Sequence, residues 1–311
     1  MKINRQPLRG LIPAVFVIIV SIISIYAGEL IFGLDAAMLS VYALFFVWTA
    51  FLISLCDRWP FEKLSQPASG LAFLMIALII GIFHPIIIQL LGFPSTLFWP
   101  LISNLFLGVG IIIAFGNKLV EGFAQPASIG LNTLFCYTLA ILIIQIFGMV
   151  PSIWFAIFVF VIFWLDFWPV KEASQPAKGI LTFVLIGALT LILEYSFIIA
   201  DTDFFNPDAS LWFVLFVWWL VLSSWQFETW PFVKFVQPEK AILGLIISVI
   251  LTFTSYYMIV LVLRFEPGIA SGYVWVFVAW LYTWDIVFGK WPAEQSTNAD
   301  NSEAPVTKLT D

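Results

Sequence analysis

Long apolar segments alternate with short polar connections along almost all of the 311 residues. Most segments reach the roughly 20 residues that a helix rising 1.5 Å per residue needs to cross about 30 Å of hydrocarbon. Backbone polar groups in lipid must be satisfied within the segment, and the alternation of barrel strands is missing, so we predict transmembrane helices. The ten predicted spans are 11–33, 37–56, 70–92, 97–115, 127–149, 152–168, 178–200, 210–228, 241–263 and 270–289.

The composition agrees with this pattern, because 62% of the residues are hydrophobic and 10% are charged. An average soluble domain is roughly 45–50% apolar and 25% charged, and it cannot hide this much apolar surface. The predicted fold class is therefore an all-α integral membrane protein of about ten transmembrane helices. No basic patch of the kind that binds nucleic acid is present. Cys56 and Cys136 lie in apolar runs and make neither a disulfide framework nor a metal site.

The basic residues predict an orientation. With a cytoplasmic N-terminus, the cytoplasmic segments hold twelve Lys and Arg residues and the opposite side holds only Arg264. Such an asymmetry over short loops follows the positive-inside rule, so both termini are predicted to be cytoplasmic. The first apolar stretch exceeds a typical signal peptide and lacks a clear cleavage site, so it is counted as a span. Short loops without a large extramembrane domain favour a prokaryotic plasma membrane.

A repeat organises the chain. Gln-Pro recurs five times, and each copy precedes two predicted spans that end, in four copies, at Trp-Pro. The second copy has Lys118-Leu119 in place of Trp-Pro. We predict five tandem helix-hairpin units, 6–60, 66–119, 125–169, 175–231 and 237–292, within one transmembrane domain, 1–292, followed by a disordered polar tail, 293–311. The motif residues are Gln6, Gln66, Gln125, Gln175, Gln237, Trp59, Trp168, Trp230 and Trp291.

The motif has two interpretations. In the first, Gln-Pro begins each odd-numbered helix, Trp-Pro ends each even-numbered one, and Trp and Lys side chains contact the lipid headgroups. In the second, the five glutamines form a polar ring on the cytoplasmic face or a docking surface for another protein. Two spans per unit give every unit the same direction, so the repeats are parallel. Five units do not divide into two equal rocking halves, which favours a ring or arc over an alternating-access carrier.

All fifteen Trp residues lie in even-numbered spans or their flanks. This distribution predicts that the even helices form an outer, lipid-facing layer with aromatic belts. The alternative is an aromatic wall that binds a flat hydrophobic ligand such as a quinone or a carotenoid. Small residues such as Gly70, Ala77 and Gly81 predict tight packing of some odd helices.

Polar residues inside predicted spans are costly and therefore point to function. Most lie toward the outer ends of odd helices, where water reaches them, which weakens the argument for a buried site. His84 is the sole histidine and cannot bind haem or zinc without partners, so a structural role is favoured. A carboxylate at Glu29 or Glu194 can carry protons, but no ladder of acids crosses the membrane. The pathway candidates are Glu29, His84, Gln89, Gln145 and Glu194.

Three functions follow, in order of preference. The first is a channel or transporter for a small solute or ion. The second is a non-catalytic membrane anchor or scaffold subunit that binds a partner protein through the cytoplasmic linkers, and the third is a lipid- or isoprenoid-active membrane enzyme. No catalytic motif is recognisable, so the sequence assigns neither a reaction nor a cofactor. The expected partners are membrane lipids and, for a scaffold, that partner protein, but not nucleic acid.

Overall fold

The computed structural model describes residues 7–147, 153–199 and 207–290. Within these ranges the chain is helical and contains no strand. Short π-helical turns extend α6, α9 and α10, over Phe160–Trp164, Tyr257–Val262 and Thr283–Val287. The α-helices are α1 (Leu8–Phe32), α2 (Ala36–Leu55), α3 (Ala68–Leu90), α4 (Phe98–Ala114), α5 (Ala127–Phe147), α6 (Ile153–Val159), α7 (Ala177–Ile199), α8 (Pro207–Trp225), α9 (Glu239–Tyr256) and α10 (Pro267–Tyr282).

Six helices of the described chain are long and apolar enough to cross a membrane. They are α1, α2, α3, α4 with the short turn before it, α5, and α9 with its π-helical extension. The apolar parts of α6, α7 and α8 within the described residues are shorter. The structure is therefore all-helical and compatible with a multi-pass membrane protein. The count of ten spans and the cytoplasmic location of the termini stay predictions.

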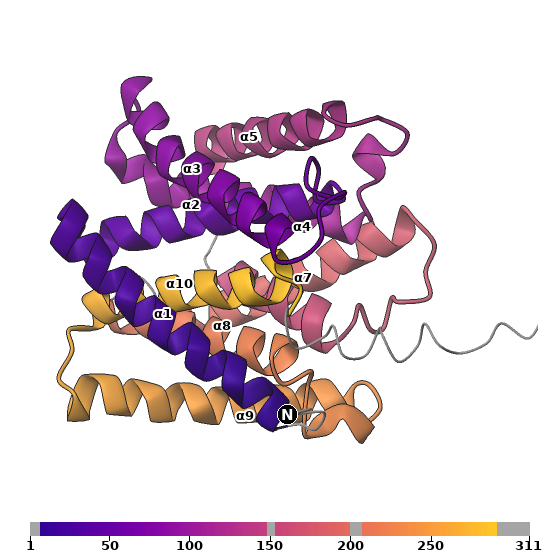
Figure 1. Ribbon diagram of the computed structural model, residues 1–311. Helices are drawn as coiled ribbons and strands as arrows, with labels where there is room; N and C mark the ends of the chain where they lie inside the picture. Colours follow the sequence, from indigo (N-terminus) through magenta and orange to yellow (C-terminus); the bar gives the residue numbers. More distant parts are fainter. Residues whose placement is uncertain (1–6, 148–152, 200–206, 291–311) are drawn as a thin grey trace, which may run out of the picture.

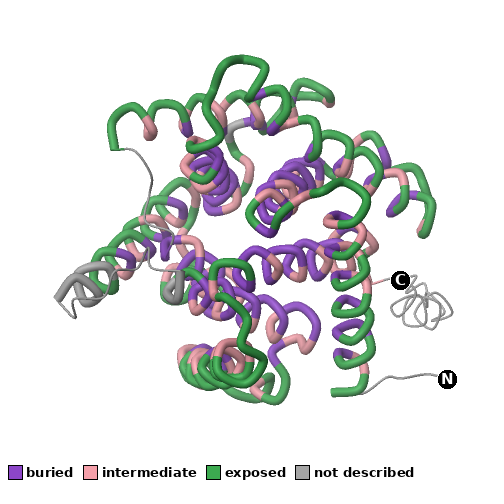
Figure 2. The backbone as a smooth tube through the Cα atoms, turned by 90° about the vertical axis from the view of Figure 1, so that its left-hand side faces the viewer, coloured by how far each residue is buried: buried purple, intermediate pink, exposed green. Residues whose placement is uncertain are grey.

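The even-numbered helices form an inner ring. They contact one another in the cyclic order α2, α4, α6, α8, α10 and back to α2. The odd-numbered helices lie outside this ring, with α3 on α2, α5 on α4, α7 on α6, α9 on α8, and α1 crossing α10 (Figure 1). Buried residues accordingly gather on the inner helices and exposed residues on those around them (Figure 2). Across the apolar windows of these helices, 78% of the α2 residues are buried, against 28% in α3 and 11% in α9.

The prediction that the even helices face the lipid was therefore wrong. Trp154 is almost fully buried against α4, and Trp48 and Trp164 are almost fully buried where inner helices pack on outer ones. Trp168 and Trp230 of the linkers are half-exposed. The prediction applied the preference of Trp for the membrane interface to all fifteen Trp residues. The exposure of Trp168 and Trp230 fits that preference, and the burial of Trp48, Trp154 and Trp164 does not. Large rings fill the space between inner helices, and aliphatic side chains of the odd helices cover the outside.

Small residues bring the outer helices close to the inner ring. A Cβ added at Gly81 of α3 would lie 2.8 Å from the Cα of Phe46 in α2. Ala77, one turn earlier in α3, is fully buried. The tight packing predicted from these small residues is confirmed for α3.

The helices that pack together are not the two helices of each predicted unit. Among the outer helices, the one on which an inner helix packs most extensively is the one that follows it through a linker, as α2 packs on α3 and α4 on α5. Helix α10 is the exception, because the outer helix on which it packs, α1, lies at the other end of the sequence. The linkers therefore join the elements that pack, and they position the site described next.

Candidate functional site

Every inner helix ends in the same backbone conformation. Two consecutive residues with positive φ follow it, and such left-handed residues commonly end helices by bonding the last free carbonyls. The second predicted unit, which lacks Trp-Pro, has this conformation at Gly116-Asn117. The four other pairs are Asp57-Arg58, Asp166-Phe167, Glu228-Thr229 and Gly289-Lys290. In the described linkers the Trp-Pro and Gln-Pro peptides are cis.

The outer helices begin at the Gln-Pro motif, as predicted. Helices α1, α3 and α9 start directly after Pro7, Pro67 and Pro238. The same holds for α5 and α7, which start at Ala127 and Ala177. The interface interpretation assigns no role to the glutamine, and the alternative places the glutamines in a polar ring or a docking surface. The structure gives the described glutamines a contact that neither interpretation included.

Each described motif glutamine connects two helices. Gln175 at the start of α7 donates its side-chain amide to the carbonyl of Ala114, the last residue of α4, over 2.8 Å. Its side-chain oxygen accepts the backbone N–H of Gly179 in the first turn of α7. Carbonyls at a helix C-terminus and N–H groups at an N-terminus lack partners within their own helix. One side chain therefore satisfies orphan groups of two different helices.

The same connection recurs around the molecule. Each of the other described glutamines donates to a carbonyl at the end of the inner helix that lies one position back in the ring. The donor–acceptor pairs are Gln66 to Val287 (3.2 Å), Gln125 to Cys56 (3.4 Å) and Gln237 to Trp164. Gln66 and Gln125 also accept the N–H group four residues later, from Gly70 and Ile129.

The second left-handed residue adds further links. Arg58 donates to the carbonyl of Val287, and Asn117 donates to the carbonyl of Leu55 over 3.0 Å. Both donors therefore meet the negative end of a neighbouring inner helix. Burial lowers the pKa of Arg58, but its guanidinium does not deprotonate in a protein and stays a cation. Lys290 instead bonds the Glu228 carboxylate over 3.0 Å.

These contacts join each linker to the next one in a closed circle. We call the segments 55–67, 114–126, 164–176, 225–238 and 287–290, each of which includes the last residue of its inner helix, the linker ring. Gln125 and Asn117 join the first two, Gln175 joins the second and third, and Gln237 joins the third and fourth. Lys290 joins the fourth and fifth, and Gln66 with Arg58 joins the first linker to the end of α10.

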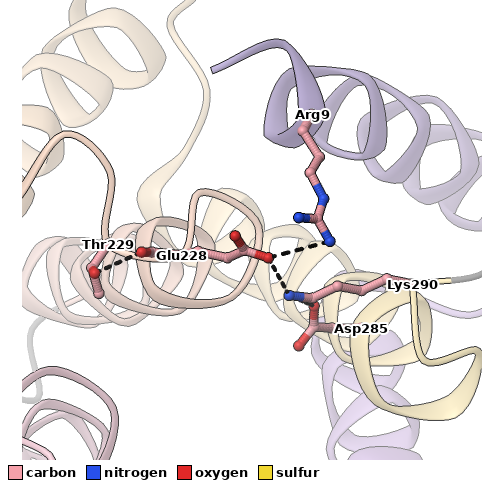
Figure 3. A network of polar contacts seen from close by, with 5 residues as sticks. All are labelled: Arg9, Glu228, Thr229, Asp285 and Lys290. Carbon is pink, nitrogen blue, oxygen red and sulfur yellow. Dashed lines mark hydrogen bonds and ion pairs between the residues drawn. The ribbon is translucent and has the colours of Figure 1, made fainter. Parts of the chain in front are cut away.

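A network of charges lies where the fourth and fifth linkers meet α1 (Figure 3). The Glu228 carboxylate lies 3.6 Å from the Arg9 guanidinium and 3.0 Å from the Lys290 ammonium. Lys290 also lies 3.7 Å from Asp285, whose side chain is only 8% exposed. Arg9 belongs to the first turn of α1, so this network joins the start of α1 and the end of α10 to the linker that follows α8.

A small cavity lies between inner helices α2, α6, α8 and α10. Its volume is about 20 Å³, slightly more than the roughly 10–15 Å³ that one water needs. The surface of the cavity is apolar, and the hydroxyl of its lining residue Tyr282 donates to the Ser54 hydroxyl over 3.2 Å. A cavity of this size is too small for a quinone or a carotenoid. The lining residues are Val47, Phe51, Phe155, Phe158, Val159, Phe163, Val221, Trp225, Val278 and Tyr282.

The predicted pathway residues are not brought together. Gln89 and Gln145 are exposed on the outer helices α3 and α5. Glu29 of α1 is half-buried and accepts a hydrogen bond from the Tyr273 hydroxyl of α10. Glu194 lies in α7, but its side chain falls outside the described residues, as do Gln6 and Trp291 entirely.

His84 is a packing residue on the outer side of α2. Its ring lies 5.3 Å from Trp48, 5.5 Å from Phe45 and 6.0 Å from Tyr137, measured between centroids. Its Nδ1 atom lies 3.0 Å from the carbonyl of Ile80 in the preceding turn. This surrounding supports the structural role that the sequence favoured.

The chain matches no protein-family model, and comparison with curated proteins and with solved structures gave no significant match. The site therefore has to be interpreted from its own geometry. Within the described residues no group of three or more His, Cys, Asp or Glu side chains is placed to hold a metal ion. Sequence reasoning missed Arg58, Asn117, Glu228 and Lys290, whose residue types differ between the linkers. The signal that they share is a fixed place at the end of an inner helix.

Proposed function

We propose that this chain is a multi-pass protein of ten transmembrane helices in a prokaryotic plasma membrane, made of five tandem units with both termini in the cytoplasm. The support is the recurrence of one backbone conformation and one glutamine contact at successive linkers. Eleven of the thirteen basic residues lie before α1, in the linkers, or in the first turn of an outer helix, one lies in the C-terminal tail, and Arg264 follows α9 at its other end. This asymmetry supports a cytoplasmic location of the linkers.

Within that membrane we propose a non-catalytic scaffold or anchor subunit, which holds a partner protein at the linker ring. The observation that carries this proposal is the closed circle of contacts, in the inner helices and again in the linkers. A carrier that alternates between two states needs two bodies that move against each other. Each described linker of this protein is bonded to the next, which favours a fixed scaffold over a carrier with two moving bodies.

The linkers also carry the groups that a partner would contact. Lys63, Lys171 and Lys234 are exposed, and each lies between a Trp-Pro and the next Gln-Pro. Trp168 and Trp230 are 40% and 41% exposed beside them. Exposed aromatic rings with cations suit both lipid headgroups and the acidic surface of a partner protein.

The test is native mass spectrometry of the full chain, purified from its own membranes in a mild detergent. We expect one stoichiometric partner protein, which is lost from the triple variant Lys63→Gln, Lys171→Gln, Lys234→Gln. The matched control is Arg264→Gln on the opposite side, which should retain the partner. A chain that is recovered alone, or a partner retained equally by both variants, would contradict the scaffold.

A channel or transporter is the second candidate, because the small cavity lies inside a closed ring of helices. An apolar constriction can gate a pore by excluding water, and Asp285 lies one turn after Tyr282 at the linker end of α10. If solute moves along this axis, Val278→Trp should block flux in proteoliposomes, while Ile79→Trp on the lipid-facing side of α3 should not. Equal flux with both variants, or no flux above empty liposomes, would exclude this route.

A further inference from the structure

The outer helix α1 is held to the ring differently from the other outer helices. Helices α3, α5, α7 and α9 each follow, through a linker, the inner helix on which they pack. Helix α1 packs on α10, which lies at the opposite end of the chain. No linker joins these two helices, so side-chain contacts hold α1 on the outside of the ring.

Polar contacts hold α1 at three depths. At the linker end, Arg9 pairs with Glu228, which also binds Lys290 (Figure 3). Near the middle, the Trp280 indole donates to the Ser24 hydroxyl over 2.9 Å. At the other end, Tyr273 donates to Glu29. Directional contacts are needed here because apolar side chains gain little by leaving lipid for a helix interface.

The connection from α1 to α2 resembles a hinge. Helix α1 ends at Phe32, and its capping residue Gly33 has a φ of +64°. The N–H groups of Gly33 and Leu34 bond the carbonyls of Glu29 and Gly28, so both residues belong to the end of α1. Asp35 then caps the start of α2 by accepting the N–H of Met38 over 2.8 Å. The connection about which α1 can swing is therefore the bond between Leu34 and Asp35.

We propose that α1 is a latch held on the outside of the ring, with Glu228 as its anchor, and that it detaches as a unit about the bond between Leu34 and Asp35. Detachment uncovers the outer face of α10, including Trp280 and Tyr273. This device is independent of the proposed scaffold function, because it concerns how α1 is held and not what binds to the linker ring. The same position in the third linker is held by Asp166, whose ion pair with Lys171 stays within that linker.

The test is a pair of distance distributions measured by electron spin resonance on the full chain in lipid nanodiscs. One pair of labels, introduced as non-native amino acids, replaces the exposed residues Ile19 of α1 and Ile246 of α9. A reference pair replaces the exposed residues Ile79 of α3 and Leu142 of α5. We expect a single narrow distribution for both pairs in the otherwise unaltered chain.

Glu228→Gln should add a second distance to the α1 pair, with a population at least several-fold above that in the parent, and leave the reference pair unchanged. Arg9→Gln should do the same, because Arg9 is the residue of α1 that pairs with Glu228. The matched control Asp166→Asn should leave both pairs unchanged. The latch is overturned if Glu228→Gln leaves the α1 pair as narrow as in the parent, or if it broadens both pairs equally.

Discussion

Helices α2 and α3 are both apolar enough to cross a membrane, yet one lies in the inner ring and the other faces outward. Most of the α2 window is buried, whereas less than a third of the α3 window is. In lipid, hydrophobicity does not separate inside from outside, because lipid tails are as apolar as the protein core. Side-chain volume separates them here: α2 contributes Phe45 and Trp48 to the core, and α3 offers Gly81 as the surface against which α2 packs.

The largest loss of stability should come from truncating a buried aromatic side chain of an inner helix. Phe45 is fully buried, so Phe45→Ala should lower the free energy of unfolding by about 3–5 kcal/mol, the usual loss for a buried aromatic ring. Ile79→Ala on the lipid-facing side of α3 should cost less than about 1 kcal/mol, since lipid replaces the lost contacts. Unfolding in mixed micelles measures both values. Similar losses for the two variants would remove the distinction between the layers.

The next largest loss of stability should come from adding a side chain where α3 packs closely on α2. Gly81→Ala places a Cβ 2.8 Å from the backbone of Phe46, which cannot move aside as a side chain can, so we expect a loss of about 1–3 kcal/mol. Gly187→Ala in α7 is the control, because nothing lies within 4 Å of its added Cβ. Its better helix propensity should leave stability unchanged or raise it by up to about 1 kcal/mol. The same unfolding assay decides, and a neutral Gly81→Ala would contradict the packing described.

A smaller effect is expected at the linker ring. Gln175→Ala removes a hydrogen bond to Ala114 and another to Gly179, which should cost about 1–2 kcal/mol. Gln89→Ala, an exposed glutamine at the far end of α3, should change stability by less than about 0.5 kcal/mol. Thermal unfolding of the two variants in the same detergent gives the comparison. If both are neutral, the glutamines are interface residues and not connectors.

The elements that the sequence predicted well depend on local chemistry. The starts of α3 and α9 directly after Pro67 and Pro238 follow from the restriction that proline places on the backbone. The positions of the apolar segments follow from the length that a membrane requires. Both signals are complete within a few neighbouring residues.

The elements that it did not predict depend on contacts between distant residues. Trp48 suits an interface and a packed core equally well by its chemistry, so its place was settled only by the neighbouring helices. Gln66 and Val287 are bonded across almost the whole chain, and nothing near either residue indicates the other. The scattered positions of Glu29, Gln89 and Gln145 likewise became visible only once the helices were assembled.

The packing of α1 on α10 is the central claim, and photo-crosslinking in native membranes tests it most directly. Phe16 of α1 lies 5.1 Å from Trp284, measured between ring centroids, and it is half-exposed, so benzoylphenylalanine fits in its place. We predict that the crosslinked peptide identified by mass spectrometry contains Trp284. A crosslink to residues 36–55 instead would show that α1 packs on α2 as a simple hairpin, and the placement of the outer helices described here would be wrong.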